Sequence, residues 1–200
     1  MNKAIETFRS NIQRVRHLGG VNKALLSLTT SALDTSDILR AQIVLSLSAL
    51  DQYIHEITVI GMVEIFSGAR APTDAFLKYR VSMEFVRDSS LLQDSKALFE
   101  SEVRERHSFL SFQHPDKVAD AIRLFSDVQL WKEVAIKLSI SAADVKTHLR
   151  LIVDRRNKIA HEADIDPSYP GARWPISEHD VDKAINFIES VCEAVHSITT

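Results

Sequence analysis

The stretch DRRNKIAHEAD at residues 154–164 ends the most informative helix that the sequence predicts. Before and through it, apolar residues recur at spacings of four and three, which is typical of an amphipathic helix: Val145, Leu149, Ile152, Ile159 and Ala163. Arg156 occupies the place in this stripe where another apolar residue is expected. A guanidinium there is costly unless it faces a carboxylate, a phosphate or a subunit boundary. Arg156 is therefore a candidate functional residue.

Asn157 and His161 follow Arg156 on the same predicted helix. They are four residues apart, so their side chains are neighbours on the helix surface. Metal-free cleavage of RNA needs a base, an acid and a cation that neutralises charge on the phosphate. His161 suits either proton role because histidine titrates near neutral pH. Arg156 suits the cationic role, and Asn157 can hold the phosphate or orient His161.

Three further basic residues of this helix, Arg150, Arg155 and Lys158, are candidates for binding the phosphates of RNA. They form a local basic patch in a chain whose net charge is −3. The alternative is an ordinary solvated helix face. In the loop that follows, Tyr169 and Trp174 offer rings on which unpaired bases can stack, although Trp174 suits a packing anchor of the loop better than a base platform.

The composition favours an all-α fold. Only 5 Gly and 5 Pro in 200 residues leave little turn material for a many-stranded sheet. The single cysteine, Cys192, excludes an internal disulfide and a cysteine-built metal site, and it favours a reducing cytoplasm. The histidines lack metal-ligand spacing, and no phosphate-binding glycine motif is present. We therefore expect no metal and no cofactor. No run approaches the about 18 apolar residues of a membrane span, so no membrane association is expected.

The apolar periodicity predicts one helical bundle over residues 1–200. An N-terminal extension, 1–33, is expected to hold two helices separated by a break at Gly19-Gly20. The other expected helices are a long one at 37–66, a short one at 75–85, one from Leu92 to Phe109, two around 118–125 and 128–138, the motif helix at 142–163 and a C-terminal helix at 178–198. Ser141 and Ser177 are the expected N-caps of the last two. Residues 89–139 carry no functional signal.

The arrangement R-N-x-x-x-H at residues 156–161 resembles the signature of the HEPN superfamily. The flanking text LDQYIHEI (50–57), RRNKIAHEAD (155–164), a Pro-rich loop and PISEHDV (175–181) is similar to its RiboL-PSP-HEPN branch. The resemblance implies an all-α bundle and an endoribonuclease that leaves 2′,3′-cyclic phosphate and 5′-hydroxyl ends. It further implies a homodimer with a composite active site, and a setting in prokaryotic defence or with an antitoxin partner.

Proton transfer independently favours a dimer, because one chain supplies one such histidine, whereas in-line cleavage needs both an acid and a base. A two-fold interface duplicates every residue and would supply both. Three polar residues of the long helix, Asp51, His55 and Glu56, are expected to be structural partners, polar groups of an interface or support for the site.

The sequence leaves three alternatives open. In the first, Arg156 pairs with Asp51 or Glu56 inside the bundle. In the second, His161 is an ordinary surface residue at a helix C-terminus. In the third, the chain is a non-catalytic HEPN-like module that binds RNA, a nucleotide or a partner protein.

Overall fold

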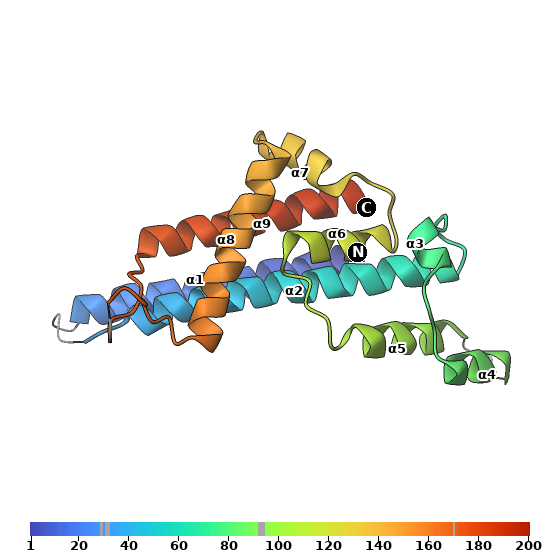
Figure 1. The fold of residues 1–200 in the computed structure, drawn as a ribbon, viewed down its shortest axis with the longest axis horizontal. Coiled ribbons are helices and arrows are strands. Elements are labelled where there is room, and N and C mark those ends of the chain that lie inside the picture. Colours follow the sequence, from blue (N-terminus) through green and yellow to red (C-terminus); the bar gives the residue numbers. More distant parts are fainter. Residues whose placement is uncertain (29, 31–32, 92–94, 170) are drawn as a thin grey trace.

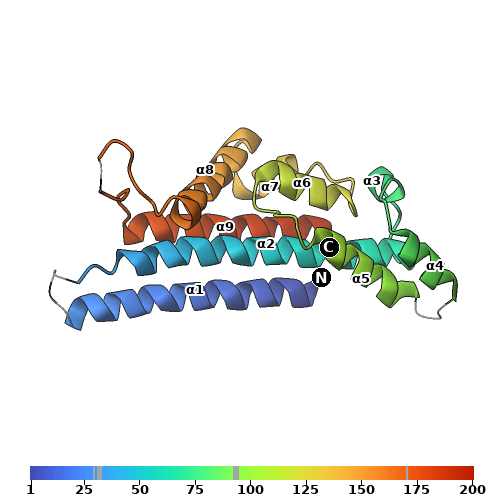
Figure 2. The same cartoon turned by 60° about the horizontal axis from the view of Figure 1, so that its bottom comes forward.

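The long helix α2 (Ser36–Phe66) is the axis of the molecule. The computed structural model describes residues 1–28, 30, 33–91, 95–169 and 171–200. Within them α2 lies alongside α1 (Asn2–Leu28) and α9 (Glu178–Thr199), and α8 (Ala142–His161) crosses over this layer (Figures 1 and 2). The other described helices are α3 (Asp74–Leu77), α4 (Met83–Leu91), α5 (Ser95–His107), α6 (Pro115–Arg123) and α7 (Leu130–Leu138). The described residues form no strand, so the predicted all-α class is confirmed.

The apolar residues of α2 explain its central position. Leu47, Ile57 and Met62 are fully buried, and they pack against residues of α1, α8 and α9 in one continuous core. By length and composition alone, α2 is apolar enough to cross a membrane. A core helix enclosed by other helices has the same composition. The predicted boundaries, 37–66, agree with the observed ones within one residue.

The predicted break at Gly19-Gly20 is wrong, because α1 continues through both glycines. Gln42 of α2 donates its Nε2–H to the carbonyl of Val15 at 3.0 Å. A Cβ on Gly19 would lie 3.0 Å from that same nitrogen, so the missing side chain allows the two helices to approach. Ile5 and Phe8 of α1 are part of the core, so the N-terminal segment is more than an extension. The expected second helix reaches residues 29, 31 and 32, which lie outside the described residues.

The middle of the chain is divided differently from the prediction. The expected helix at 75–85 is interrupted between α3 and α4. Ser82 ends the interruption: its Oγ accepts a hydrogen bond from the Phe85 amide at 3.1 Å, and its own N–H and O–H donate to Glu102 of α5 at 2.6 and 2.7 Å. The helix expected from Leu92 to Phe109 ends at His107, which leaves Phe109 89% exposed. Leu92 lies outside the described residues.

Two helical glycines provide a matched test of packing. A Cβ on the buried Gly61 of α2 would overlap the ring of Phe125, whereas a Cβ on the exposed Gly20 of α1 would meet nothing. We expect Gly61→Ala to lower the free energy of unfolding by about 1–3 kcal/mol. We expect Gly20→Ala to raise it by about 0.5–1 kcal/mol, because alanine loses less backbone entropy. Urea denaturation of both variants measures the difference. Equal effects would show that Phe125 moves aside without cost.

Candidate functional site

Helix α8 begins with the N-cap that its sequence predicts and ends in a turn that the sequence did not predict. The Ser141 hydroxyl accepts a hydrogen bond from the Asp144 amide at 3.0 Å and donates to the Asp144 carboxylate at 2.7 Å. The helix ends at His161, two residues before the predicted boundary. There Ala163 and Asp164 have φ angles of +52° and +58°, and the Asp164 amide donates to the carbonyl of Lys158 at 3.0 Å. This turn directs the chain back toward the N-terminal end of α2.

The buried face of α8 passes through Val145, Leu149 and Val153. The predicted stripe contained Ile152 in place of Val153, but Ile152 is only half-buried. Arg156 and Asn157 come three and four residues after Val153, so both continue the inward face by one more turn. Arg156 and Asn157, both half-buried, therefore stand where the next apolar residues of this face would be expected.

Arg156 has no carboxylate partner among the described residues. Its Nη1 donates to Asn157 Oδ1 at 3.0 Å, and its buried Nε has no hydrogen-bond partner there. The alternative ion pair with Asp51 or Glu56 is not formed. The Asp51 carboxylate accepts hydrogen bonds from the Phe112 amide at 2.6 Å and from the Gln113 side chain at 3.1 Å. The Glu56 carboxylate accepts two from Arg104 of α5, both at 2.9 Å, which lowers its pKa.

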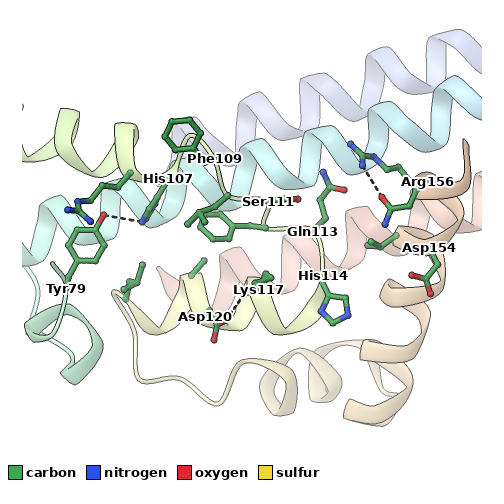
Figure 3. A pocket seen from close by; sticks show the side chains of 17 residues that line it. Tyr79, His107, Phe109, Ser111, Gln113, His114, Lys117, Asp120, Asp154 and Arg156 are labelled. Atoms are coloured by element: carbon green, nitrogen blue, oxygen red, sulfur yellow. Dashed lines mark hydrogen bonds and ion pairs between the residues drawn. The ribbon is translucent and has the colours of Figure 1, made fainter. Parts of the chain in front are cut away.

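Arg156 and Asn157 line one end of a cavity of about 810 Å³ (Figure 3). The loop 108–114 between α5 and α6 forms one wall, and residues of α6 form another. His161 does not line this cavity. It lies one turn beyond Asn157 and is exposed, and its side chain makes no hydrogen bond or ion pair within the described residues. The structure thus brings Arg156 and Asn157 together and leaves His161 free at the end of the helix.

Asp51 and His55 hold the loop that forms the cavity wall. Besides the two hydrogen bonds to Asp51, His55 Nε2 lies 3.3 Å from the carbonyl oxygen of Leu110. The His55 ring packs on Phe112, with 4.4 Å between centroids. Asp51 and His55 thus attach this cavity wall to α2, while Glu56 fastens α5 to α2.

The predicted phosphate-binding residues separate into two groups. Arg155 donates to Asp164 at 2.9 Å and to the carbonyl of Pro175 at 3.1 Å, and burial lowers its pKa. Lys158 lies over the Trp174 ring, 4.8 Å from its centroid. Arg155 and Lys158 therefore both attach the loop after α8 to this helix. Arg150 is exposed and has no such partner among the described residues. Of the three, Arg150 is the one that the fold leaves free for a phosphate.

One buried cluster of ion-paired side chains next to α8 was not predicted from the sequence. Asp164 is fully buried, and its Oδ2 accepts hydrogen bonds from Arg40 of α2 at 2.7 Å and from Arg155. Arg40 also donates to the carbonyl of Trp174 at 2.9 Å. Aspartate tolerates the left-handed backbone conformation, so the position of Asp164 just after a helix was the sequence feature that could have indicated this cluster. No group of three or more potential metal ligands occurs among the described residues.

Comparison with known proteins places the chain in a family. Neither a curated protein nor a solved structure matches it. The family model described as RiboL-PSP-HEPN matches residues 8–200, which include every helix that contributes to the site. Since this match extends over almost the whole length, the chain belongs to the RiboL-PSP-HEPN family.

Proposed function

We propose that the protein is a metal-independent endoribonuclease of the HEPN type. The observation that carries this proposal is Arg156: its guanidinium continues the inward face of α8, lacks a carboxylate partner among the described residues and lines an open cavity. A permanently charged group in such a place needs an anion. A phosphodiester supplies that anion, and a bidentate contact would stabilise the charge that develops on its oxygens during cleavage.

Asn157 and His161 complete the proposed chemistry. The Asn157 amide already accepts a hydrogen bond from Arg156, so it fixes the direction of the guanidinium. His161 transfers protons: as the base it removes the proton of the ribose 2′-hydroxyl, and as the acid it protonates the leaving 5′-oxygen. Attack by the 2′-oxygen forms a 2′,3′-cyclic phosphate while the bond to the 5′-oxygen breaks.

Two copies of His161 are needed for both proton transfers, so the proposal includes a homodimer with a composite site. The surface beside His161 suits a subunit boundary. There Val44, Leu45, Ile159 and Ala163 line an open hollow of about 460 Å³, and Leu45 is 45% exposed. Apolar surface of this kind favours burial against a partner. A cytoplasmic setting in prokaryotic defence, with an antitoxin that neutralises the enzyme, is the remaining part of the proposal.

The test is cleavage of RNA by the purified protein in EDTA. We expect cleavage to continue in the chelator and the products to carry cyclic phosphates, which phosphatase alone does not remove. Cleavage that stops in EDTA and returns with Mg²⁺ would contradict the metal-independent mechanism. Stable binding of RNA that stays intact over a long incubation would favour the non-catalytic binding module.

A further inference from the structure

The cavity that begins at Arg156 extends far beyond the space that one phosphate needs. Its volume, about 810 Å³, lies in the range of sites for whole small molecules. In Figure 3 the labelled side chains run from Arg156 and Asp154 at one end, past Gln113 and Ser111, to His107 and Tyr79 at the other. Arg156 therefore occupies one end of a longer site whose remainder the proposed cleavage chemistry does not use.

The wall of this cavity is held in place before any ligand binds. The loop 108–114 is attached to α2 by the Phe112 amide and the Gln113 side chain, both of which donate to Asp51. The contact of His55 with Leu110 adds a third attachment. A wall fixed in this way loses little conformational entropy when a ligand binds. The cavity is thus preorganised for a ligand.

An unpacked aromatic ring stands at the rim. Phe109 lines the cavity and is 89% exposed, so its ring contributes almost nothing to the core of the subunit. Leu110, its neighbour, is 49% exposed. Exposed aromatic rings beside a polar groove are the platforms on which proteins stack unpaired bases. A planar ligand that stacks on the ring would explain why Phe109 is exposed at the rim of the cavity.

The interior of the cavity offers hydrogen-bonding groups and a cation. His107 is 3% exposed, and burial lowers its pKa to about 4, so the ring is neutral at pH 7. One ring nitrogen lies 3.4 Å from the Tyr79 hydroxyl, while its buried Nδ1 has no partner among the described residues. Across the cavity, Lys117 of α6 is exposed, and its Nζ lies 4.0 Å from a carboxylate oxygen of Asp120, which also lines the cavity. This combination suits a ligand with ring nitrogens, hydroxyls and a negative charge.

We propose that the cavity binds a nucleotide of single-stranded RNA that adjoins the phosphate held by Arg156. Its base stacks on Phe109, its polar edge faces His107 and Gln113, and its own phosphate faces Lys117. The proposal rests on the function proposed above, because Arg156 sets the register of the strand. Since a paired base cannot leave its stack to meet Phe109 without a cost, the site selects unpaired RNA.

The test measures affinity for RNA in protein that carries His161→Ala, so that the RNA stays intact. A fluorescent 12-nucleotide single strand is titrated at physiological salt. We expect Phe109→Ala to weaken binding about tenfold, the effect of losing one stacked base. Ser111→Trp, which places a large ring inside the cavity, should weaken it at least as much. Both positions are exposed, so the variants should fold, as circular dichroism will verify.

Leu28→Ala is the matched control, because Leu28 is a large apolar residue at the end of α1, is 82% exposed and does not line the cavity. Its affinity should stay within twofold of the parent. A duplex of the same sequence should bind more weakly and be insensitive to Phe109→Ala. Unchanged single-strand affinity in both cavity variants would overturn the proposal, as would an equal loss of affinity caused by Leu28→Ala.

The two proposals can fail separately. If protein with an intact His161 cuts RNA and the two cavity variants cut it with unchanged kcat/KM, the nuclease stands and the nucleotide site is refuted. If RNA is never cut but the cavity variants still lose affinity for the single strand, the nucleotide site stands and the nuclease is refuted.

Discussion

Replacing His161 by alanine is expected to lower the rate of RNA cleavage by about 10²- to 10⁴-fold, the contribution of a general acid or base. The reason is that His161 is the titratable residue one turn beyond the Arg156–Asn157 pair, with a side chain free of partners among the described residues. Loss of a labelled RNA under single-turnover conditions measures the effect. His179→Ala is the control, since His179 is an exposed histidine in the first turn of α9. It should cut like the parent.

Mixed dimers sharpen this prediction. If each cleavage event needs His161 from both subunits, co-expression of parent and His161→Ala chains should give activity that falls with the square of the parent fraction. Half parent chain should then leave about a quarter of the activity, by random pairing of subunits. A linear fall would show that each subunit acts alone. Unaltered cleavage by the pure His161→Ala protein would remove the mechanism altogether.

Replacing Asp164 by alanine is expected to lower the free energy of unfolding by about 3–5 kcal/mol, because it leaves buried cations without their counter-charge. Asp164 is fully buried, and the side chain of Arg40 is 7% exposed. Both Arg40 and Arg155 lose a hydrogen-bonded partner, and alanine is also strained at the positive φ of this position. Guanidinium chloride denaturation, followed by tryptophan fluorescence, measures the loss.

Two controls separate the causes. Asp164→Asn keeps a residue that tolerates positive φ and keeps an acceptor oxygen, so it isolates the charge and should cost less than alanine. Asp34→Ala removes a carboxylate from the exposed pair with Arg173 and should cost far less than Asp164→Ala, because solvent screens an exposed ion pair. If Asp164→Ala cost no more than Asp34→Ala, the buried ion pair would not stabilise the turn after α8.

The sequence was most informative where the signals are local. The periodicity of α2, the serine caps of α8 and α9 and the spacing of Arg156, Asn157 and His161 all depend on residues within a few turns of one another. These features were predicted, as were the fold class and the family. Local signals also misled: Gly19-Gly20 resembled a helix end because the contact with Gln42, which lies on another helix, is invisible in the sequence.

The sequence by itself determined the all-α class, the long helix α2, the N-caps of α8 and α9 and the family, because helix periodicity, capping and side-chain type are properties of neighbouring residues. It also supplied the candidate residues for the chemistry. Only the tertiary structure decided which charges stay free. Arg155 shares the Asp164 carboxylate with Arg40, which comes from a helix more than a hundred residues earlier, whereas Arg156 meets no carboxylate among the described residues and borders the cavity. Burial and ion pairing depend on which distant side chains the fold brings together, so they could not be inferred from spacing along the chain.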